Sequence, residues 1–331
     1  LLRSSMRVKE FRNKYPLWKE ALEDIGDDLM KEIFRSRETY AIFRGLRNKV
    51  GGLKNISIRF YVNREMHPLI LEALNEDLGG HRNFWMLKAP ICRKYSVGID
   101  KLRFLPLFED EETRKKRPNC LVIEADVSGW ADEIEKHLKP LDNIKKESAT
   151  IKELWKKFKQ KRRLGEIEVL REDVTADAVE AKLEDGTVWH IVHFAGHSFY
   201  VPDKDDPTQG NGFLAMQKDK DSKTRIQSVN IRLFSNWLRK AKTRFIYLSS
   251  CESSNDDFVY ELASNSIPAV LGFRWDLDDP KAAEHVEHFY EHLFAIKSLE
   301  YAFLHTRQDM HNKHKKHNIW AAPMLMMQGR Q

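Results

Sequence analysis

Short apolar strands alternate with amphipathic helices along the second half of the chain, and this alternation most constrains the fold. Residues 188–194, 245–249 and 267–273 are apolar runs of strand length, and residues 229–240 between the first two repeat apolar side chains at helical spacing. Such an order produces βαβ units and a mainly parallel sheet flanked by helices, which is the α/β class. The same rhythm is weaker in residues 50–165.

The full set of predicted elements follows from hydrophobic periodicity and from turn and cap residues. Helices are predicted over 17–46, 68–78, 130–138, 149–161, 175–183, 229–240 and 256–264, with two more beginning at Asp279 and Ser298. Strands are predicted over 56–62, 84–87, 119–125, 166–170, 188–194, 245–249, 267–273 and 321–327. Residues 199–215 are predicted to form a loop, because PDKDDPTQGNG within them is rich in turn formers.

Two short phrases place reactive side chains just beyond predicted strands. HFAGHS puts His197 after the 188–194 strand, and YLSSCES puts Cys251 after the 245–249 strand. Reactive groups cluster at the carboxyl ends of strands in open α/β sheets. Either residue alone fits an ordinary core position. Together, on neighbouring strands, they favour a dyad in which the imidazole removes the thiol proton, with the backbone amides of Ser198 and Cys251 as oxyanion donors.

Other histidines offer weaker alternatives. His193 is a rival base, but its place within the strand favours a hydrogen-bonded core residue. The remaining histidines of the last third are interpreted as polar helix edges or exposed loop, because no carboxylate pattern completes a metal site: His285, His288, His292, His305, His311, His314 and His317. No metal and no cofactor are expected.

Composition is that of an ordinary globular protein, with 41% hydrophobic and 32% charged residues and a net charge of +6. Three separated cysteines, of which Cys92 and Cys120 fall in apolar segments, indicate a reducing compartment, and we expect a cytoplasmic protein. Because the chain starts at Leu1 without a signal-peptide pattern, we expect a fragment of a longer chain. Basic runs at 152–163 and 313–317 could hold phosphate, although solvated surface is the favoured interpretation.

These phrases together resemble the CHAT domain, a caspase-like module of the clan that includes caspases, separase and gingipains. The matching segments are VHFAGHS (192–198), GNGFLAM (210–216), FIYLSSCESS (245–254), IPAVLGFRWDLDDPKAA (267–283), HFYEHL (288–293) and IWAAPMLM (319–326). Upstream, HPLILEALNED (67–77), FWMLKAPICRKY (84–95) and CLVIEADVSG (120–129) resemble the family's non-catalytic lobe. The resemblance implies an N-terminal helical segment (1–50), a degenerate caspase-like lobe (51–165) and a catalytic lobe (166–331).

The resemblance also implies that His197 is the general base and Cys251 the nucleophile of a cysteine endopeptidase. Family members usually carry glycine after the histidine, where this chain has Ser198, and the tryptophan-glutamate of the upstream lobe is absent. The loop after the 267–273 strand lines the specificity pocket in this clan. Asp276 is therefore expected to select a basic side chain, and Glu252 either to line the same pocket or to orient the loop.

The implied function is cleavage of one dedicated protein substrate, regulated by a partner or by a fused sensor or repeat domain, in bacterial antiviral defence. Contact with nucleic acid is expected only indirectly, and contact with a membrane is not expected. The alternative is a non-catalytic caspase-like module that binds a partner protein or a nucleoprotein assembly.

Overall fold

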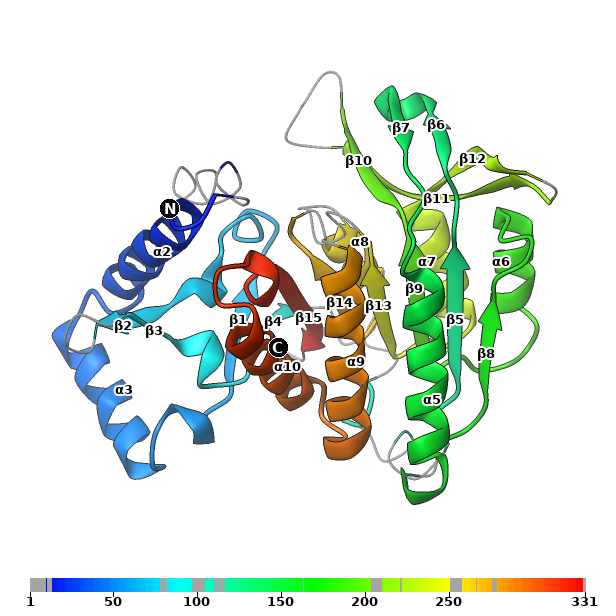
Figure 1. Ribbon diagram of the computed structural model, residues 1–331. Coiled ribbons are helices and arrows are strands. Elements are labelled where there is room, and N and C mark those ends of the chain that lie inside the picture. The colour runs from blue at the N-terminus through cyan, green and yellow to red at the C-terminus, as the bar shows by residue number, and fades with distance from the viewer. Residues whose placement is uncertain are drawn as a thin grey trace.

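One eight-stranded sheet runs through the described part of the chain, in the order β1-β4-β15-β14-β13-β9-β5-β8 (Figure 1). The structure is a computed structural model that describes residues 14–77, 82–96, 105–109, 117–162, 164–203, 210–220, 222–250, 258–265, 267–275 and 279–329, with residues 10 and 113. The sheet strands are β1 (Ile58–Val62), β4 (Ile91–Ser96), β5 (Cys120–Ala125), β8 (Ile167–Leu170), β9 (Ile191–Gly196), β13 (Phe245–Ser249), β14 (Ala269–Phe273) and β15 (Pro323–Gly329). All neighbouring pairs are parallel except β14 and β15.

Helices cover both faces of this sheet. The covering helices are α5 (Ile144–Arg162), α6 (Ala176–Leu183), α7 (Ile231–Lys240), α8 (Phe258–Ser264), α9 (Asp279–Ile296) and α10 (Leu299–Lys313). Helices α2 (Leu17–Ile33) and α3 (Arg37–Lys49) precede the first strand, and α2 packs against β2 and the turn at Leu71–Ala73. Helix α9 packs between α5 and α10 on one face, while α7 contacts α6 and α8 on the other (Figure 1). The predicted α/β class with a mainly parallel sheet is confirmed.

Smaller strand pairs surround the main sheet. They are β2 (Asn75–Asp77) with β3 (Arg82–Phe84), β6 (Gly129–Ala131) with β7 (Lys136–Leu138), and the antiparallel sheet of β10 (Ser198–Pro202), β11 (Gly210–Asp219) and β12 (Ser222–Asn230). Single 3-10 turns occupy Leu53–Asn55, Leu71–Ala73, Trp85–Leu87, Asp132–Ile134 and Asn318–Trp320.

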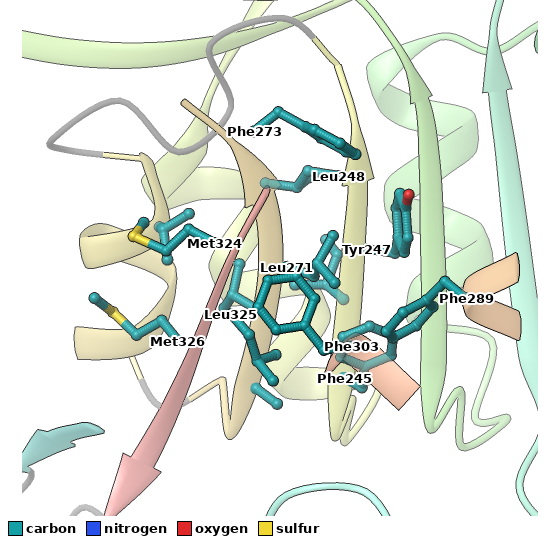
Figure 2. Packing of buried hydrophobic residues seen from close by; sticks show 14 of the residues in the cluster. Phe245, Tyr247, Leu248, Leu271, Phe273, Phe289, Phe303, Met324, Leu325 and Met326 are labelled. Atoms are coloured by element: carbon teal, nitrogen blue, oxygen red, sulfur yellow. The ribbon is translucent and has the colours of Figure 1, made fainter. Parts of the chain in front are cut away.

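Aromatic packing between β13 and α9 forms the centre of the core (Figure 2). The ring of Phe289 lies 5.6 Å from that of Phe245 and 5.4 Å from that of Tyr247, centroid to centroid. All three side chains are fully buried. Strand β13 is buried along its whole length because helices cover both of its faces.

Several sequence-based expectations are wrong in detail. The helix predicted over 17–46 is two helices, because Ser36 interrupts it and its hydroxyl caps α3 by accepting a bond from the amide of Thr39. Where a helix over 68–78 and a strand over 84–87 are predicted, the described residues form 3-10 turns at Leu71–Ala73 and Trp85–Leu87 and the short pair β2–β3.

Two further corrections concern the region above the sheet. Residues 130–138, predicted as a helix, form the β6–β7 hairpin, because β6 packs against β12. The loop predicted over 199–215 contains β10 and the first half of β11, which pair with each other. In both places tertiary pairing overrides the local pattern.

Strands from both predicted lobes lie in the one sheet. Strand β5, from the 51–165 segment, pairs on one side with β8 and on the other with β9, both from the 166–331 segment. At the opposite edge β4 pairs with β15 in the same way. The division of the chain into lobes stays a prediction.

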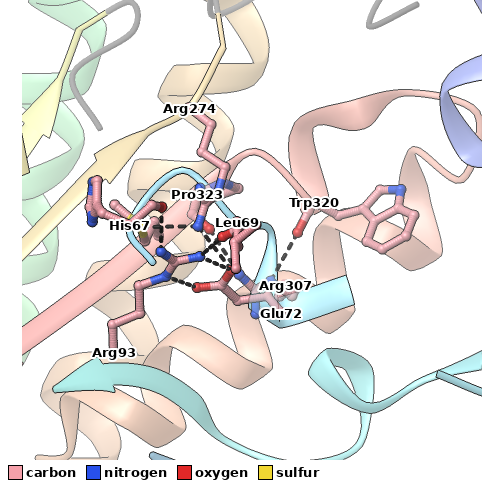
Figure 3. Close-up of polar contacts among 9 residues, drawn as sticks. His67, Leu69, Glu72, Arg93, Arg274, Arg307, Trp320 and Pro323 are labelled. Atoms are coloured by element: carbon pink, nitrogen blue, oxygen red, sulfur yellow. Dashed lines mark hydrogen bonds and ion pairs between the residues drawn. The ribbon is translucent and has the colours of Figure 1, made fainter. Parts of the chain in front are cut away.

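A buried ionic cluster joins the upstream segment to the end of β14 (Figure 3). Glu72 accepts hydrogen bonds from Arg93 Nε (2.8 Å) and Nη2 (3.0 Å) and from Arg274 Nη2 (2.9 Å). Arg307 donates beside them to the carbonyls of Trp320 and Pro323. Burial and the charge of Arg274 lower the pKa of Arg307 to about 10, so it stays charged at neutral pH.

Replacing Glu72 by glutamine should lower the free energy of unfolding at pH 7 by about 3–5 kcal/mol, because it leaves buried arginines without their counter-ion. Denaturant titration measures the change. Glu20→Gln on the exposed side of α2 is the control and should shift stability by less than about 0.5 kcal/mol. Equal stability of Glu72→Gln and the wild type would show that Glu72 does not stabilise the fold as the counter-ion of the buried arginines.

The difference in unfolding free energy between the wild type and Glu72→Gln should depend on pH. Burial alone would raise the pKa of Glu72, but the charges of Arg93 and Arg274 hold it well below its usual value. A carboxylate with a lowered folded-state pKa stabilises the fold above its unfolded pKa and loses that contribution as the pH falls. The stability difference should be full above about pH 5 and shrink below about pH 4.3.

Candidate functional site

The strands that carry the predicted dyad are neighbours. β9 and β13 pair in parallel, with Ala195 opposite Ser249. His197 is the second residue after Ala195, and Cys251 is the second residue after Ser249 in the sequence. The two strands are therefore neighbours in the sheet, and the chain between them forms β10, β11, β12 and α7. Cys251, Glu252 and Asp276 lie outside the described residues.

The ring of His197 is held by the backbone of another segment. Its Nε2 lies 2.7 Å from the carbonyl oxygen of Lys139, the residue after β7. Because a carbonyl only accepts, the ring donates through Nε2, and in the neutral ring Nδ1 is then the basic nitrogen. The carbonyl of His197 in turn accepts from the amide of Ala215 on β11 (3.0 Å). Hydrogen bonds thus hold both the ring and the backbone carbonyl of His197.

The β6–β7 hairpin that leads to Lys139 is itself anchored on the three-stranded sheet. Gly129 has φ of +145°, and a Cβ there would lie 2.2 Å from the carbonyl oxygen of Thr224 on β12. Only glycine permits this approach. Leu138 from β7 packs in a small apolar cluster with Phe199 and Ala215 from the sheet. The Lys139 carbonyl, which orients His197, therefore directly follows a strand that is held against the three-stranded sheet.

Ser198, the predicted oxyanion donor, begins β10 and is buried, with Leu214 opposite it. The donor role of its amide stays a prediction.

His193, the rival base, is a fully buried core residue. Its Nδ1 lies 3.2 Å from the hydroxyl of Tyr290, and its Nε2 lies 3.2 Å from Oε2 of Glu147. The other carboxylate oxygen of Glu147 accepts from the hydroxyl of Ser249 (3.0 Å). The interpretation of His193 as a hydrogen-bonded strand residue agrees with these contacts.

Three further histidines and two cysteines lie in the core or form ion pairs between helices. Burial lowers the pKa of His285 to about 3, and this neutral ring contacts the Tyr247 hydroxyl at 2.7 Å. His292 pairs with Asp309 and His314 with Glu284, both between α9 and α10. The described residues contain no group of three or more side chains able to hold a metal ion. Cys92 and Cys120 are buried, and burial raises both thiol pKa values.

The basic runs make ordinary surface contacts where they are described. Lys157 pairs with Glu291 on α9, and Lys313 pairs with Glu284. No helix within the described ranges has the length and apolar character needed to cross a membrane.

Sequence reasoning missed two contributors to this site. Lys139 acts through its carbonyl, a group that every residue has, so no side-chain pattern could mark it. Glu147 lies among lysines and serine in KKES and looks like a solvent-facing helix residue, yet it is 2% exposed. It is a core carboxylate because α5 packs against the sheet and places Glu147 beside Ser249 of β13 and His193 of β9.

The fold and the site define an α/β protein with a fixed histidine at the carboxyl end of a parallel strand, beside a strand that leads to a cysteine. Residues 48–329 match the family model of the CHAT domain. The chain therefore belongs to the CHAT domain family, and the predicted resemblance is confirmed.

Solved structures give a more distant likeness. The chain is similar to the crystal structure of the Arg-specific cysteine proteinase gingipain R (RgpB), with 11% identity and a TM-score of 0.49 over 98% of this chain and 72% of that one. It is also similar to the complex of the pro- and mature domains of Porphyromonas gingivalis RgpB, with 11% identity and a TM-score of 0.48 over 96% of this chain and 70% of that one. No curated protein matches the chain.

The tautomer of His197 provides a direct check of this geometry. At a pH where the ring is neutral, ¹⁵N NMR should show a protonated Nε2 and an unprotonated Nδ1, because Nε2 faces the Lys139 carbonyl. His197→Gln assigns the signals. Gly129→Ala should disturb them, since the new methyl group would collide with the Thr224 carbonyl. An Nδ1-protonated ring in the wild type would contradict the arrangement.

Proposed function

We propose that this chain is a cysteine endopeptidase in which His197 and Cys251 form the catalytic dyad. The observation that carries the proposal is the parallel pairing of β9 with β13, in which the residues two positions before His197 and Cys251 stand opposite each other. The contact between His197 Nε2 and the Lys139 carbonyl supports it, because it leaves Nδ1 as the base. Membership of the CHAT domain family supports the class of reaction.

The chemistry proceeds in two steps. His197 takes the thiol proton of Cys251, and the thiolate sulfur bonds to the carbonyl carbon of the scissile peptide. The amides of Ser198 and Cys251 stabilise the oxyanion of the tetrahedral intermediate. As the C–N bond breaks, His197 gives the proton to the leaving amine. Water, deprotonated by His197, then attacks the thioester, releasing the carboxylic acid product and restoring the thiol.

Substrate selection is assigned to the loop after β14 and to the residue after the nucleophile. Asp276 is proposed to accept a hydrogen bond from an arginine or lysine before the scissile bond, with Glu252 lining the same pocket. Asp276 is the third residue after Phe273, which ends β14.

The proposed setting is cytoplasmic bacterial defence, with cleavage of one dedicated protein under control of a partner or fused sensor. The reduced state that a thiol nucleophile requires fits this setting.

Cys251→Ala and His197→Ala should each abolish cleavage, because one removes the nucleophile and the other its base. Proteins captured by the Cys251→Ala chain serve as substrates. They are incubated with each purified variant, and new N-termini are read by mass spectrometry. Both variants should keep the wild-type melting temperature within a few degrees.

His292→Ala is the matched control, because His292 pairs with Asp309 on the surface between α9 and α10. It should cleave as the wild type does. Cleavage that survives Cys251→Ala would end the proposal. Stable capture of a partner that the wild-type chain never cuts would instead favour a non-catalytic interaction module.

Asp276→Asn should weaken cleavage after arginine or lysine by roughly 2–5 kcal/mol in transition-state free energy, because a buried cation loses its partner. Fluorogenic peptides that differ only at the residue before the cut provide the measurement. Asp219→Asn, which removes an exposed pair with Arg225 on β12, is the control. An apolar preference that is the same in wild type and Asp276→Asn would show that other residues form the pocket.

A further inference from the structure

The first turn of α5 carries a carboxylate beneath the strand ends that lead to the proposed dyad. Glu147 is 2% exposed, and both of its oxygens are used. Oε1 accepts from the hydroxyl of Ser249 at 3.0 Å, and Oε2 lies 3.2 Å from Nε2 of His193. One side chain therefore touches the last residue of β13 and the middle of β9.

The same helical turn also begins close to the group that orients His197. Lys139 supplies the carbonyl that faces His197 Nε2, and α5 begins five residues later at Ile144. Asn143 closes this short link, because its carbonyl accepts from the amide of Glu147 (2.9 Å). The start of α5 thus adjoins three parts of the proposed site: β9, β13 and the Lys139 segment.

We infer that Glu147 is a positioning residue for the His197–Cys251 dyad. This inference rests on the proposed function and deepens it. By holding Ser249 and His193 together, Glu147 ties the last residue of β13 to the middle of β9. Ser249 precedes Cys251 by two residues, and His193 precedes His197 by four, so a displacement of either strand end changes the approach of sulfur to imidazole.

A hydrogen-bonded carboxylate suits this task better than an apolar side chain, because its two bonds have fixed directions. Glutamine can keep both bonds: its oxygen accepts from Ser249, and its amide donates to Nε2 of His193 when the ring proton lies on Nδ1, facing Tyr290. Alanine keeps neither bond. The two substitutions therefore separate positioning from charge.

The test follows the reactivity of Cys251 against pH, using iodoacetamide on the folded chain. Cys92 and Cys120 react slowly because burial raises their thiol pKa values. In the wild type a well-placed imidazolium should lower the pH midpoint for Cys251. Ser249→Ala and Glu147→Ala should raise that midpoint by about one unit and lower kcat on a captured substrate about tenfold with little change in KM. Glu147→Gln should keep both the Cys251 midpoint and kcat close to their wild-type values.

Glu300→Ala is the matched control for loss of a buried carboxylate. Glu300 is 6% exposed and accepts from Arg59 and Cys92 at the β1–β4 edge. It should reduce the melting temperature, as Glu147→Ala does, and leave the Cys251 midpoint unchanged. Because Ser249→Ala removes a single hydroxyl, it keeps the test valid even where Glu147→Ala fails to fold.

The outcomes separate two failures. If His197→Ala moves the Cys251 midpoint but Ser249→Ala does not, Glu147 is structural only and the positioning role is wrong. An equal shift of the midpoint in Glu300→Ala would also overturn the positioning role. If His197→Ala leaves the midpoint unchanged, no dyad exists, and the proposed function fails together with the positioning role.

Discussion

The parallel register between β9 and β13 is the constraint on which the rest of the structure depends. Hydrogen bonds between the two strands set Ala195 against Ser249 and His193 against Tyr247. A shift of one residue would turn every side chain of a strand to the other face of the sheet. Both faces are covered by helices, so such a shift would expose neither face to water but would misfit the aromatic packing around Phe289. Packing in the core thus secures the alignment at the strand ends.

Buried polar groups reinforce this alignment at two levels. Near the strand ends, Glu147 connects α5 to Ser249 and His193. Further along the sheet, Glu72 connects Arg93 on β4 to Arg274 after β14. A buried carboxylate is stable only when its partners keep their places, so each one penalises alternative packings of the elements that it joins. The sheet is therefore specified by directional contacts as well as by apolar burial.

The sequence predicts some parts of this molecule well, for identifiable reasons. Strands β5, β9, β13 and β14 consist mostly of apolar residues, and the helices predicted to begin near Thr175 and Ser298 are α6 and α10, each capped by that residue's hydroxyl. The hairpin at 129–138 could not be predicted from the sequence, because Trp130, Ile134 and Leu138 recur at helical spacing and so indicate a helix. What makes it a hairpin is the close passage of β6 along β12, a contact between distant segments. For the site, residue type singled out His197, whereas the Lys139 carbonyl has no sequence signal.

The hairpin also carries the one tryptophan that faces water. Seven of the eight tryptophans are at most 3% exposed, and Trp130 on β6 is 55% exposed. Its cross-strand partner is His137, two residues before Lys139. An aqueous quencher such as iodide should therefore contact the indole of Trp130 and quench its fluorescence, while the other seven indoles are not quenched. Trp130 is thus an intrinsic fluorescent probe on the segment that holds the ring of His197. A molecule that binds over this hairpin should reduce the quenching of Trp130 by iodide, and no added label is needed to detect it.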